Sequence, residues 1–383
     1  MPRQLASLQR VLAVEPIPGA DRIEIATVQG WSCIVLKSEN ISVGDLVVYI
    51  EIDSIVPARE PFLFLEPRKY RVRTIKMKGV ISQGLAMPIS AFPEITKIAE
   101  GLDITELLGI TKYDPEAIKE QRTSRVVDTK PHPVREFFMQ FAWFRALHRY
   151  LYPGAKKGWP SFIHKTDETR IQNYGATVMA KLDEDYYITE KLDGQSGTYF
   201  VIYTKSLFGG RKPMFGVCSR NLYLKTKHAC TWWNIAQQYD IERKLRSVGK
   251  EICIQGEIIG QGIQGNKYGL SGLDFYVFNV WDITKQEYYP YQDLVKFCKT
   301  LGFKMVPVVA ECVKLPKTLP EIIALSKGKS VLNPKILREG IVARTMTNLP
   351  NGTPLSWKSI DGDFLLKHQD EEYADVEEDT TPA

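Results

Sequence analysis

The sequence predicts an α+β protein made of two globular parts joined by a connector. The first observation is length, since 383 residues suffice for two or three domains with their own cores. The second is a series of short strand patterns separated by turns, which fills residues 5–109. The third is a later β-rich region, in which strand-like runs approach and leave a turn near residue 193. A hydrophobic content of 44% and a charged content of 25% are typical of a globular chain.

Several protein classes are disfavoured by what the chain lacks. No apolar run reaches the roughly 20 residues of a membrane-spanning helix, so no membrane partner is expected. The start, Met1-Pro-Arg-Gln4, does not open a signal peptide. The six cysteines are scattered without a Cys-x-x-Cys pair, so neither a zinc site nor a disulfide framework is implied. These observations predict a reduced, intracellular protein, in the cytoplasm or the nucleus.

Residues 1–113 are predicted to form a small β-barrel of the OB type. The strand patterns are separated by turn chemistry such as Pro16-Ile-Pro-Gly19, and they cover residues 11–14, 22–28, 31–36 and 46–52. About five short strands within roughly a hundred residues are typical of an OB barrel. The run from Pro16 to Glu24 also resembles OB-like tRNA-binding modules.

A cation-rich run from Arg68 to Lys78 follows in the same module. The run is predicted to be a strand with one basic face, the kind of surface on which an OB domain follows a phosphate backbone. Trp31 and Tyr70 lie in the same module and favour contact with nucleic acid. The alternative is an exposed edge strand that uses its charges against aggregation.

Residues 114–157 are predicted to be a connector, and residues 369–383 an acidic disordered tail. Within the connector, Val134 to Tyr150 has an aromatic face at helical spacing, which indicates a helix packed against a neighbouring domain. The tail holds seven acidic residues and no Lys or Arg. Without these seven charges the net charge rises from +5 to +12, and a basic body points to a polyanionic partner.

The stretch from Tyr187 to Gly197 organises the second part of the chain. A strand-like approach ends in Lys191-Leu-Asp-Gly194, and a second β-rich run leaves this turn. A lysine at a strand edge can attack the α-phosphate of a nucleoside triphosphate and carry the nucleotide as a phosphoramidate. Because the ordinary pKa of lysine is about 10.4, the site must bury the lysine or place other cations beside it. By itself, an Asp-Gly pair is also what an ordinary β-turn contains.

Five further elements follow Lys191 in an order that resembles the covalent nucleotidyltransferases, which are the ligases of DNA and RNA and the mRNA capping enzymes. They are Ser219-Arg-Asn221, a glutamate with a glycine-rich loop at 257–266, an aromatic strand at 274–283, Glu339-Gly-Ile-Val-Ala-Arg344 and Ser356-Trp-Lys358. The resemblance implies that residues 158–368 form an adenylation domain of antiparallel sheets with flanking helices.

The same resemblance implies roles for nine residues. Lys191 is the nucleophile, while Lys358 neutralises the α-phosphate and lowers the pKa of Lys191. Asp193 and Glu339 hold a hydrated divalent metal ion, Mg²⁺ or Mn²⁺, that polarises the phosphate. Phe278 stacks on the purine, and Glu257 and Arg220 contact the ribose. Arg170 binds the departing pyrophosphate, and Glu190, next to the nucleophile, is a further nucleotide contact. Core packing for Phe278, and structural ion pairs for Arg170 and Arg220, are the alternatives.

One position departs from the pattern. Many phage-type RNA ligases carry Lys-x-Lys in the fifth element, whereas Ile360 stands at the second position here. Either Lys358 works alone, or Lys367 further along the chain contributes the second phosphate contact.

The order of the domains favours one branch of the superfamily. DNA ligases and capping enzymes place an OB domain after the fifth element, but only 23 residues follow Ile360, and the OB candidate precedes Lys191. This order, with Lys165-Thr-Asp-Glu-Thr-Arg170, resembles the Naegleria- and Deinococcus-type RNA ligases over nearly the whole chain. The resemblance implies an ATP-dependent enzyme that joins 3′-hydroxyl and 5′-phosphate RNA ends, favouring nicks in duplexes; we expect a monomer. A GTP-dependent capping-type guanylyltransferase and a catalytically silent RNA-end-binding protein stay open as alternatives.

Overall fold

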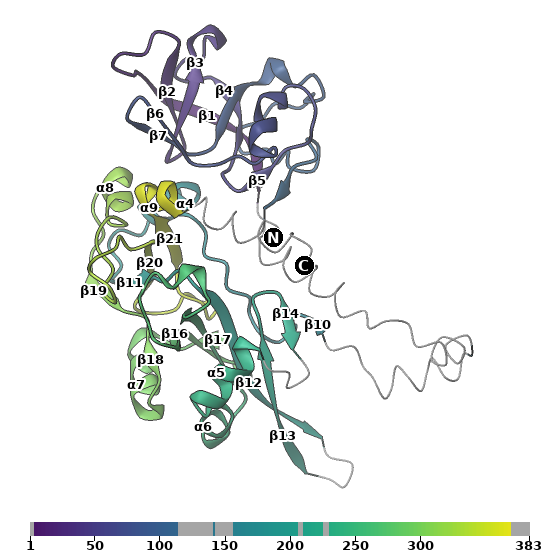
Figure 1. The fold of residues 1–383 in the computed structure, drawn as a ribbon, viewed down its shortest axis with the longest axis vertical. Helices are drawn as coiled ribbons and strands as arrows, with labels where there is room; N and C mark the ends of the chain where they lie inside the picture. Colours follow the sequence, from purple (N-terminus) through teal and green to yellow (C-terminus); the bar gives the residue numbers. More distant parts are fainter. Residues whose placement is uncertain (1–3, 114–140, 142–155, 206–209, 225–229, 369–383) are drawn as a thin grey trace.

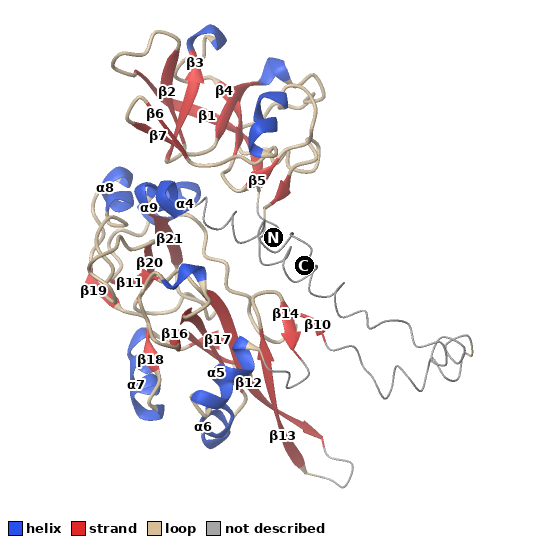
Figure 2. Cartoon of the chain, in the orientation of Figure 1, coloured by secondary structure: helices blue, strands red, loops and turns tan. Residues whose placement is uncertain are grey.

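The computed structural model describes residues 4–113, 141, 156–205, 210–224 and 230–368 of the chain. Figure 1 shows two parts one above the other, with α4, α8 and α9 of the second part facing the first. Strands occur in both parts, and helices flank the sheets of the second (Figure 2). This is the α+β class that the sequence predicts. Most of the predicted connector, with its aromatic helix, and the acidic tail lie outside the described residues. Within the described part of the chain, no helix has the length and apolar character to cross a bilayer.

The N-terminal part is built on a curled antiparallel sheet of order β3-β2-β1-β4-β8. The long strand β1 pairs with β2 through its second half and with β4 through its first half, and a register shift between Val11 and Ala13 lets it bend. Apolar side chains pack on both faces, around Leu8 on one and around Trp31 on the other. The result is the OB-like half-barrel that the turn pattern predicts. The strands of the N-terminal part, which include the separate pairs β5-β9 and β6-β7, are β1 (Ala6–Pro16), β2 (Ile23–Val28), β3 (Trp31–Leu36), β4 (Leu46–Ile50), β5 (Ser54–Ile55), β6 (Ile75–Met77), β7 (Val80–Ser82), β8 (Leu85–Pro88) and β9 (Thr111–Lys112).

The cation-rich run from Arg68 to Lys78 does not form the single strand that we predicted. A 3-10 helix, η2 (Leu63–Arg68), occupies its start, and Lys69 and Tyr70 have φ angles of 52° and 59°, left-handed values that interrupt a strand. Only the residues of β6 pair in a ladder, with β7. The cations are therefore separated, because Arg71 is buried whereas Lys76 and Lys78 are exposed.

The second part is centred on a larger sheet of order β10-β14-β13-β12-β15-β16-β17, to which β18 adds in parallel beside β16. Helices α5, α6 and α7 pack their apolar residues against this sheet in one core that includes Tyr199 and Val277. The elements are β10 (Lys156–Gly158), β12 (Gln195–Lys205), β13 (Arg211–Cys218), β14 (Leu222–Leu224), α5 (Thr231–Gln238), α6 (Ile241–Ser247), β15 (Ile252–Gly260), β16 (Leu273–Asp282), β17 (Glu287–Tyr288), α7 (Tyr291–Leu301) and β18 (Lys304–Met305).

A smaller sheet of order β19-β11-β20-β21 brings the motifs together. Lys191 at the end of β11 pairs with Gly340, the residue that follows Glu339, and Val342 of β20 pairs with Lys358 of β21. Apolar residues of α4 and α8 join the core of this sheet. Its elements and the last helices are α4 (Ile171–Met179), β11 (Tyr186–Lys191), β19 (Val308–Val313), α8 (Leu319–Ala324), β20 (Gly340–Thr345), β21 (Ser356–Ile360) and α9 (Gly362–His368).

The two parts are joined by specific contacts. The indole nitrogen of Trp31 donates to Asn173 Oδ1 at 2.5 Å, and Asn173 Nδ2 donates in turn to the carboxylate of Glu51. Leu365 of α9 packs against the core around Trp31. The N-terminal part is therefore docked beside the smaller sheet, which is the sheet that carries the motifs.

Candidate active site

Lys191 and Asp193 lie where β11 ends and the chain turns into β12. The turn can approach β15 closely because Gly194 has no side chain, and a Cβ there would lie 2.3 Å from the carbonyl oxygen of Ile258. The hydroxyl of Tyr268 accepts a hydrogen bond of 2.8 Å from the amide of Asp193. The Lys-Leu-Asp-Gly stretch is thus held rigidly at the end of a strand, which presents the lysine in a defined position.

The nucleophile candidate is ion-paired in the structure. Lys191 Nζ donates to Glu339 Oε2 at 2.7 Å, a contact that follows from the pairing of β11 with β20. Burial by itself lowers the pKa of Lys191, but the carboxylates of Glu339, Glu257 and Asp193 outweigh it and raise the pKa above its ordinary value. Lys191 is therefore held as an ammonium and must lose a proton before it can attack. That Lys358 lowers the pKa of Lys191 stays a prediction.

Lys358 reaches the same cavity from β21. Its ammonium lies 3.4 Å from Asp167 Oδ1, and its side chain is only 13% exposed. Ile360, two residues on, is buried and lines the cavity, whereas Lys367 is exposed on α9 and lies outside the lining. Lys367 is therefore not among the residues that line the cavity with Lys358.

An aromatic wall and a buried ion pair form another side of the cavity. The guanidinium of Arg344 lies 6.0 Å from the ring centroid of Phe278 and donates to Glu168 Oε1 at 2.8 Å. Burial by itself lowers the pKa of Arg344, but Glu168 outweighs it, so the guanidinium keeps its charge. This pair fixes the surroundings of Phe278, and a fixed flat ring suits a purine base.

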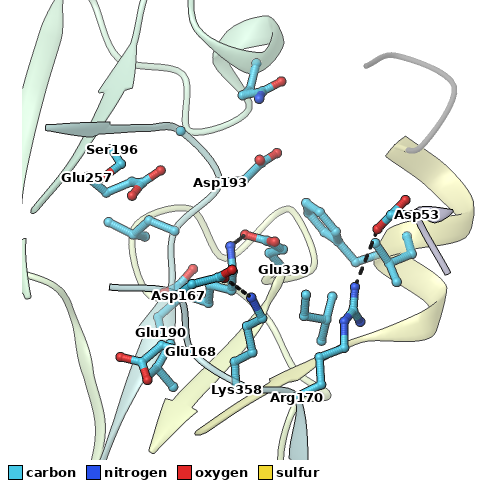
Figure 3. A pocket seen from close by; sticks show the side chains of 18 of the residues that line it. Asp53, Asp167, Glu168, Arg170, Glu190, Asp193, Ser196, Glu257, Glu339 and Lys358 are labelled. Atoms are coloured by element: carbon cyan, nitrogen blue, oxygen red, sulfur yellow. Dashed lines mark hydrogen bonds and ion pairs between the residues drawn. The ribbon is translucent and has the colours of Figure 1, made fainter. Parts of the chain in front are cut away.

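All nine residues predicted for the site line one cavity of ≈ 290 Å³. Figure 3 labels Arg170, Glu190, Asp193, Glu257, Glu339 and Lys358 among the residues around this cavity. The nine residues come from segments far apart in the chain and are Arg170, Glu190, Lys191, Asp193, Arg220, Glu257, Phe278, Glu339 and Lys358. The structure thus brings them together around the Lys191–Glu339 pair, while their individual roles stay predictions.

Glu190 has a structural contact in addition to its place in the cavity. Its carboxylate oxygen Oε2 accepts a hydrogen bond of 2.7 Å from the amide of Val331. The residue is 1% exposed, and burial raises its pKa. Glu190 therefore anchors the segment that leads from Val331 to Glu339.

Sequence reasoning missed the residues that the N-terminal part contributes. Asp53, Arg71 and Lys112 line the cavity together with the motif residues. Asp53 Oδ1 accepts from Arg71 at 2.6 Å, and its Oδ2 lies 3.8 Å from the guanidinium of Arg170 (Figure 3). Because such contacts depend on how the two parts of the molecule dock, no local sequence pattern predicts them.

Lys267 was also missed. It follows the short turn η4 (Gln264–Asn266) of the glycine-rich loop and forms an ion pair with Asp193. Its ammonium also lies 5.1 Å from the ring centroid of Phe364 on α9. The glycine-rich loop thus carries a buried cation to the carboxylate that we predicted as a metal contact.

Asp193 and Glu339 fit a hydrated ion better than a directly ligated one. In the described ranges, no three His, Cys, Asp or Glu side chains gather as a set of direct ligands. The two carboxylates flank Lys191 and are 12% and 11% exposed. Mg²⁺ in phosphate-transfer sites keeps several waters and binds through one or two carboxylates plus substrate phosphates. Two carboxylates beside the nucleophile match that mode of binding.

Comparison with known proteins bears on both parts of the chain. A family model described as RNA ligase matches residues 184–360, and an OB-fold domain model matches residues 5–89. A solved structure of a Naegleria gruberi RNA ligase mutant with ATP and Mn is 30% identical, with a TM-score of 0.76 over 96% of this chain and 99% of that one. The chain belongs to the RNA ligase family. The Naegleria gruberi RNA ligase with PPi is 31% identical, with a TM-score of 0.77 over 96% and 99% of the two chains. No match was found among curated protein sequences.

Membership of this family confirms the predicted class of enzyme, an ATP-dependent RNA ligase. It also accounts for the order of the motifs and for the OB-like part that precedes Lys191 in this RNA ligase. The alternatives of a capping-type guanylyltransferase and of a silent RNA-binding protein receive no support from either family model.

Proposed function

We propose that this RNA ligase seals breaks with a 3′-hydroxyl and a 5′-phosphate, at nicks in duplex RNA, through three successive transfers that begin with ATP. One observation carries the proposal: nine residues from distant segments surround a single cavity, with Lys191 Nζ 2.7 Å from Glu339 at its centre. An ordinary structural ion pair would not require this set of cations, carboxylates and an aromatic ring around it.

In the first transfer, the neutral amine of Lys191 attacks the α-phosphorus of ATP. A nitrogen–phosphorus bond forms, the bond between the α-phosphorus and the bridging oxygen breaks, and pyrophosphate leaves. Lys191 has already released its ammonium proton to solvent, and the phosphoramidate nitrogen loses a further proton. Lys358 stabilises the charge that develops on the α-phosphate, and Arg170 binds the departing pyrophosphate.

In the second transfer, an oxygen of the RNA 5′-phosphate attacks the AMP phosphorus and displaces Lys191, which regains its proton. In the third, the RNA 3′-hydroxyl loses its proton, attacks the 5′-phosphorus and expels AMP. Each transfer exchanges one bond to phosphorus for another, so no oxidant or further reactant is needed. Alignment of the two RNA ends supplies much of the rate, since holding reactants in position removes a large entropic cost.

The chemistry of the residues that line the cavity supports the proposed contacts to the nucleotide and the metal ion. Phe278 stacks on the purine, Glu257 and Arg220 contact the ribose, and Glu190 supports the strand that carries the lysine. Asp193 and Glu339 hold the hydrated Mg²⁺ or Mn²⁺, which supplies charge neutralisation at the α-phosphate when bound. The Naegleria relatives were solved with ATP, AMP or PPi, several of them with Mn, which supports this choice of ligands.

RNA is the partner that the family implies, and the N-terminal OB-like part is proposed to hold the strand beside the break. The proposal includes a division into an OB domain at 1–113, a connector at 114–157, an adenylation domain at 158–368 and an acidic tail at 369–383. We also propose that the enzyme is a monomer and acts inside the cell.

The deciding experiment is nucleotide labelling of the purified protein. Incubation with a divalent metal and either α-labelled ATP or α-labelled GTP is followed by denaturation and detection of label on the polypeptide. We expect label from ATP that is absent in Lys191→Ala, followed by sealing of a 5′-phosphate nick. Label from GTP alone would replace the proposal by capping-type chemistry. Sealing of the nick by Lys191→Ala with ATP would overturn the covalent mechanism.

A further inference from the structure

The segment between α8 and β20 carries a cluster of cations outside the catalytic cavity. We call residues 327–335 the basic loop, because they contain Lys327, Lys329 and Lys335 and no Asp or Glu. All three lysines are exposed, and none of them lines the cavity. Within the described part of the chain, no carboxylate forms an ion pair with any of the three. Isolated surface lysines are often only solvated, but several on one short segment favour a partner of opposite charge.

The backbone at the start of the basic loop is held by a buried arginine. Arg338 is 9% exposed, and its guanidinium donates to the carbonyl oxygens of residues 325, 326 and 327 at 2.7, 3.0 and 2.5 Å. The two arms of the loop are also joined, since the amide of Ser330 donates to Ile336 O at 3.1 Å. The lysine side chains therefore project from a fixed backbone, which keeps their charges together.

Two further hydrogen bonds place the basic loop at the rim of the cavity. The amide of Val331 donates to Glu190 Oε2 at 2.7 Å, and Glu190 directly precedes the proposed nucleophile. The side-chain amide of Asn333 donates to Lys267 O at 3.1 Å, and Lys267 pairs with Asp193. Both Glu190 and Lys267 line the cavity. The loop is thus attached to β11 and to the glycine-rich loop, the two segments that carry these contacts to the catalytic turn.

The outer side of the basic loop is open to a large ligand. Val331 at its tip is 53% exposed, as are the three lysines to a similar class. In the second transfer the RNA 5′-phosphate has to reach the AMP on Lys191, so the RNA backbone beside the break lies close to this rim. Double-stranded nucleic acid carries about one negative charge per 2 Å of its axis, a density that clustered lysines neutralise.

We propose that the basic loop is an RNA-binding surface, on which Lys327, Lys329 and Lys335 contact phosphates of the duplex beside the break. The inference deepens the proposed function and rests on it, because it needs RNA at the rim of this cavity. The three lysines bind and align the RNA, and they take no part in the transfer of AMP to Lys191.

The test compares four full-length proteins. They are the unmodified protein, an alanine triple variant (Lys327→Ala, Lys329→Ala, Lys335→Ala), an arginine triple variant (Lys327→Arg, Lys329→Arg, Lys335→Arg) and a control triple variant (Lys97→Ala, Lys296→Ala, Lys299→Ala). The control removes the same charge at exposed positions outside the cavity lining, one on the N-terminal part and two on α7. Since all six lysines are exposed, the unfolding midpoints should stay close to that of the unmodified protein.

Binding is measured as the Kd for a nicked RNA duplex over a series of salt concentrations. In the alanine triple variant we expect the Kd to rise about 10-fold or more at low salt, because phosphate contacts supply most of the sequence-independent affinity. The slope of log affinity against log salt should fall by about 1 for each lysine that contacts a phosphate. The arginine triple variant should bind like the unmodified protein, and the control triple variant should keep the slope.

Two activity measurements separate RNA binding from nucleotidyl transfer. Label transfer from α-labelled ATP needs no RNA, so it should stay within about two-fold in the alanine triple variant. Nick sealing by this variant should be slow at low RNA concentration and approach the normal rate at saturating RNA, which is the pattern of a lost binding contact.

The possible results separate this inference from the proposed function. A Kd and a salt slope of the alanine triple variant equal to those of the control overturn the inference and leave the proposed function standing. Loss of label transfer in step with RNA binding would also overturn it, because the loop would then act by holding Glu190. Equal losses in the arginine and alanine triple variants would exclude contact with phosphate. An unmodified protein that takes no label overturns the proposed function, while the binding comparison still decides whether the loop contacts RNA.

Discussion

Lys191 Nζ lies 2.7 Å from Glu339 Oε2, so the proposed nucleophile of this RNA ligase and the carboxylate of its fourth motif form a partly buried ion pair across β11 and β20. The pair aligns the amine toward the cavity and keeps it charged, because the surrounding carboxylates raise its pKa. A cationic nitrogen has no lone pair with which to attack. The same contact therefore positions the amine and favours its charged form.

Replacement of Lys191 by arginine separates these two effects. Lys191→Arg keeps a cation for Glu339 and should leave the unfolding midpoint close to that of the unmodified protein. Label transfer from ATP should fall to background, because a guanidinium is not deprotonated in proteins and cannot act as the nucleophile. Label in Lys191→Arg at a substantial fraction of the normal rate would show that another residue carries the nucleotide.

Gly194 is predicted to be essential for space. In Gly194→Ala the new Cβ would meet Ile258 O at 2.3 Å and Ile259 Cγ2 at 2.7 Å, so β15 or the catalytic turn must shift. We expect a loss of about 1–3 kcal/mol in stability and a strong loss of label transfer. Gly272→Ala is the matched control, since no atom lies within 4 Å of its Cβ. Denaturant unfolding and labelling of both variants check the prediction, and equal behaviour of the two would contradict it.

Lys76 and Lys78 are predicted to contact the RNA backbone. Both are exposed on the β6–β7 hairpin, whereas Arg71 of the same run faces the catalytic cavity. The double variant Lys76→Ala with Lys78→Ala should weaken binding to a nicked duplex and reduce the slope of log affinity against log salt by about 1 for each phosphate that the protein no longer neutralises. Lys37→Ala with Lys97→Ala removes the same charge elsewhere on the domain. An identical salt slope in the two double variants would exclude a specific contact.

Asp282 is predicted to stabilise the fold in a pH-dependent way. Burial by itself raises the pKa of its carboxyl, but Lys250 at 2.8 Å and the amides of Thr284 and Lys285 outweigh it, so the pKa lies below its ordinary value. A lowered pKa in the folded state means that this stabilisation is complete above the unfolded pKa of about 3.9 and is lost as the pH falls through the folded pKa. Asp282→Asn should cost about 1–3 kcal/mol at neutral pH.

The check on Asp282 is denaturant unfolding of both proteins at several pH values from neutrality downward. The difference in the free energy of unfolding should narrow as the pH falls below about 4, where the carboxyl of the unfolded chain becomes protonated, and should be lost below the lower pKa of the folded carboxyl. A difference that stays constant over this range would assign the effect to shape and not to charge.

The sequence by itself determined the class of enzyme and predicted nine residues that line one cavity. Each motif is carried by one strand or one turn, so its residues are recognisable without knowledge of the rest, as with Lys191-Leu-Asp-Gly194 and Glu339-Gly340. Alternation and turn chemistry likewise predicted the OB-like half-barrel, because successive residues of a half-buried strand alternate between the core and the solvent. The exception was the run from Arg68 to Lys78, where left-handed backbone at Lys69 and Tyr70 breaks the strand in a way that charge patterning does not reveal.

Only the tertiary structure decided which cations meet at the cavity. Lys112 approaches Asp167, and Asp53 approaches Arg170, through the docking of two parts that are separate in sequence. Such contacts depend on the docked geometry of whole domains, set by Trp31, Asn173 and the residues around them, and not on any local period. The sequence shows that Ile360 stands where many phage-type RNA ligases have a second lysine. That Lys112 lines the cavity follows only from the docking of the N-terminal part beside the smaller sheet.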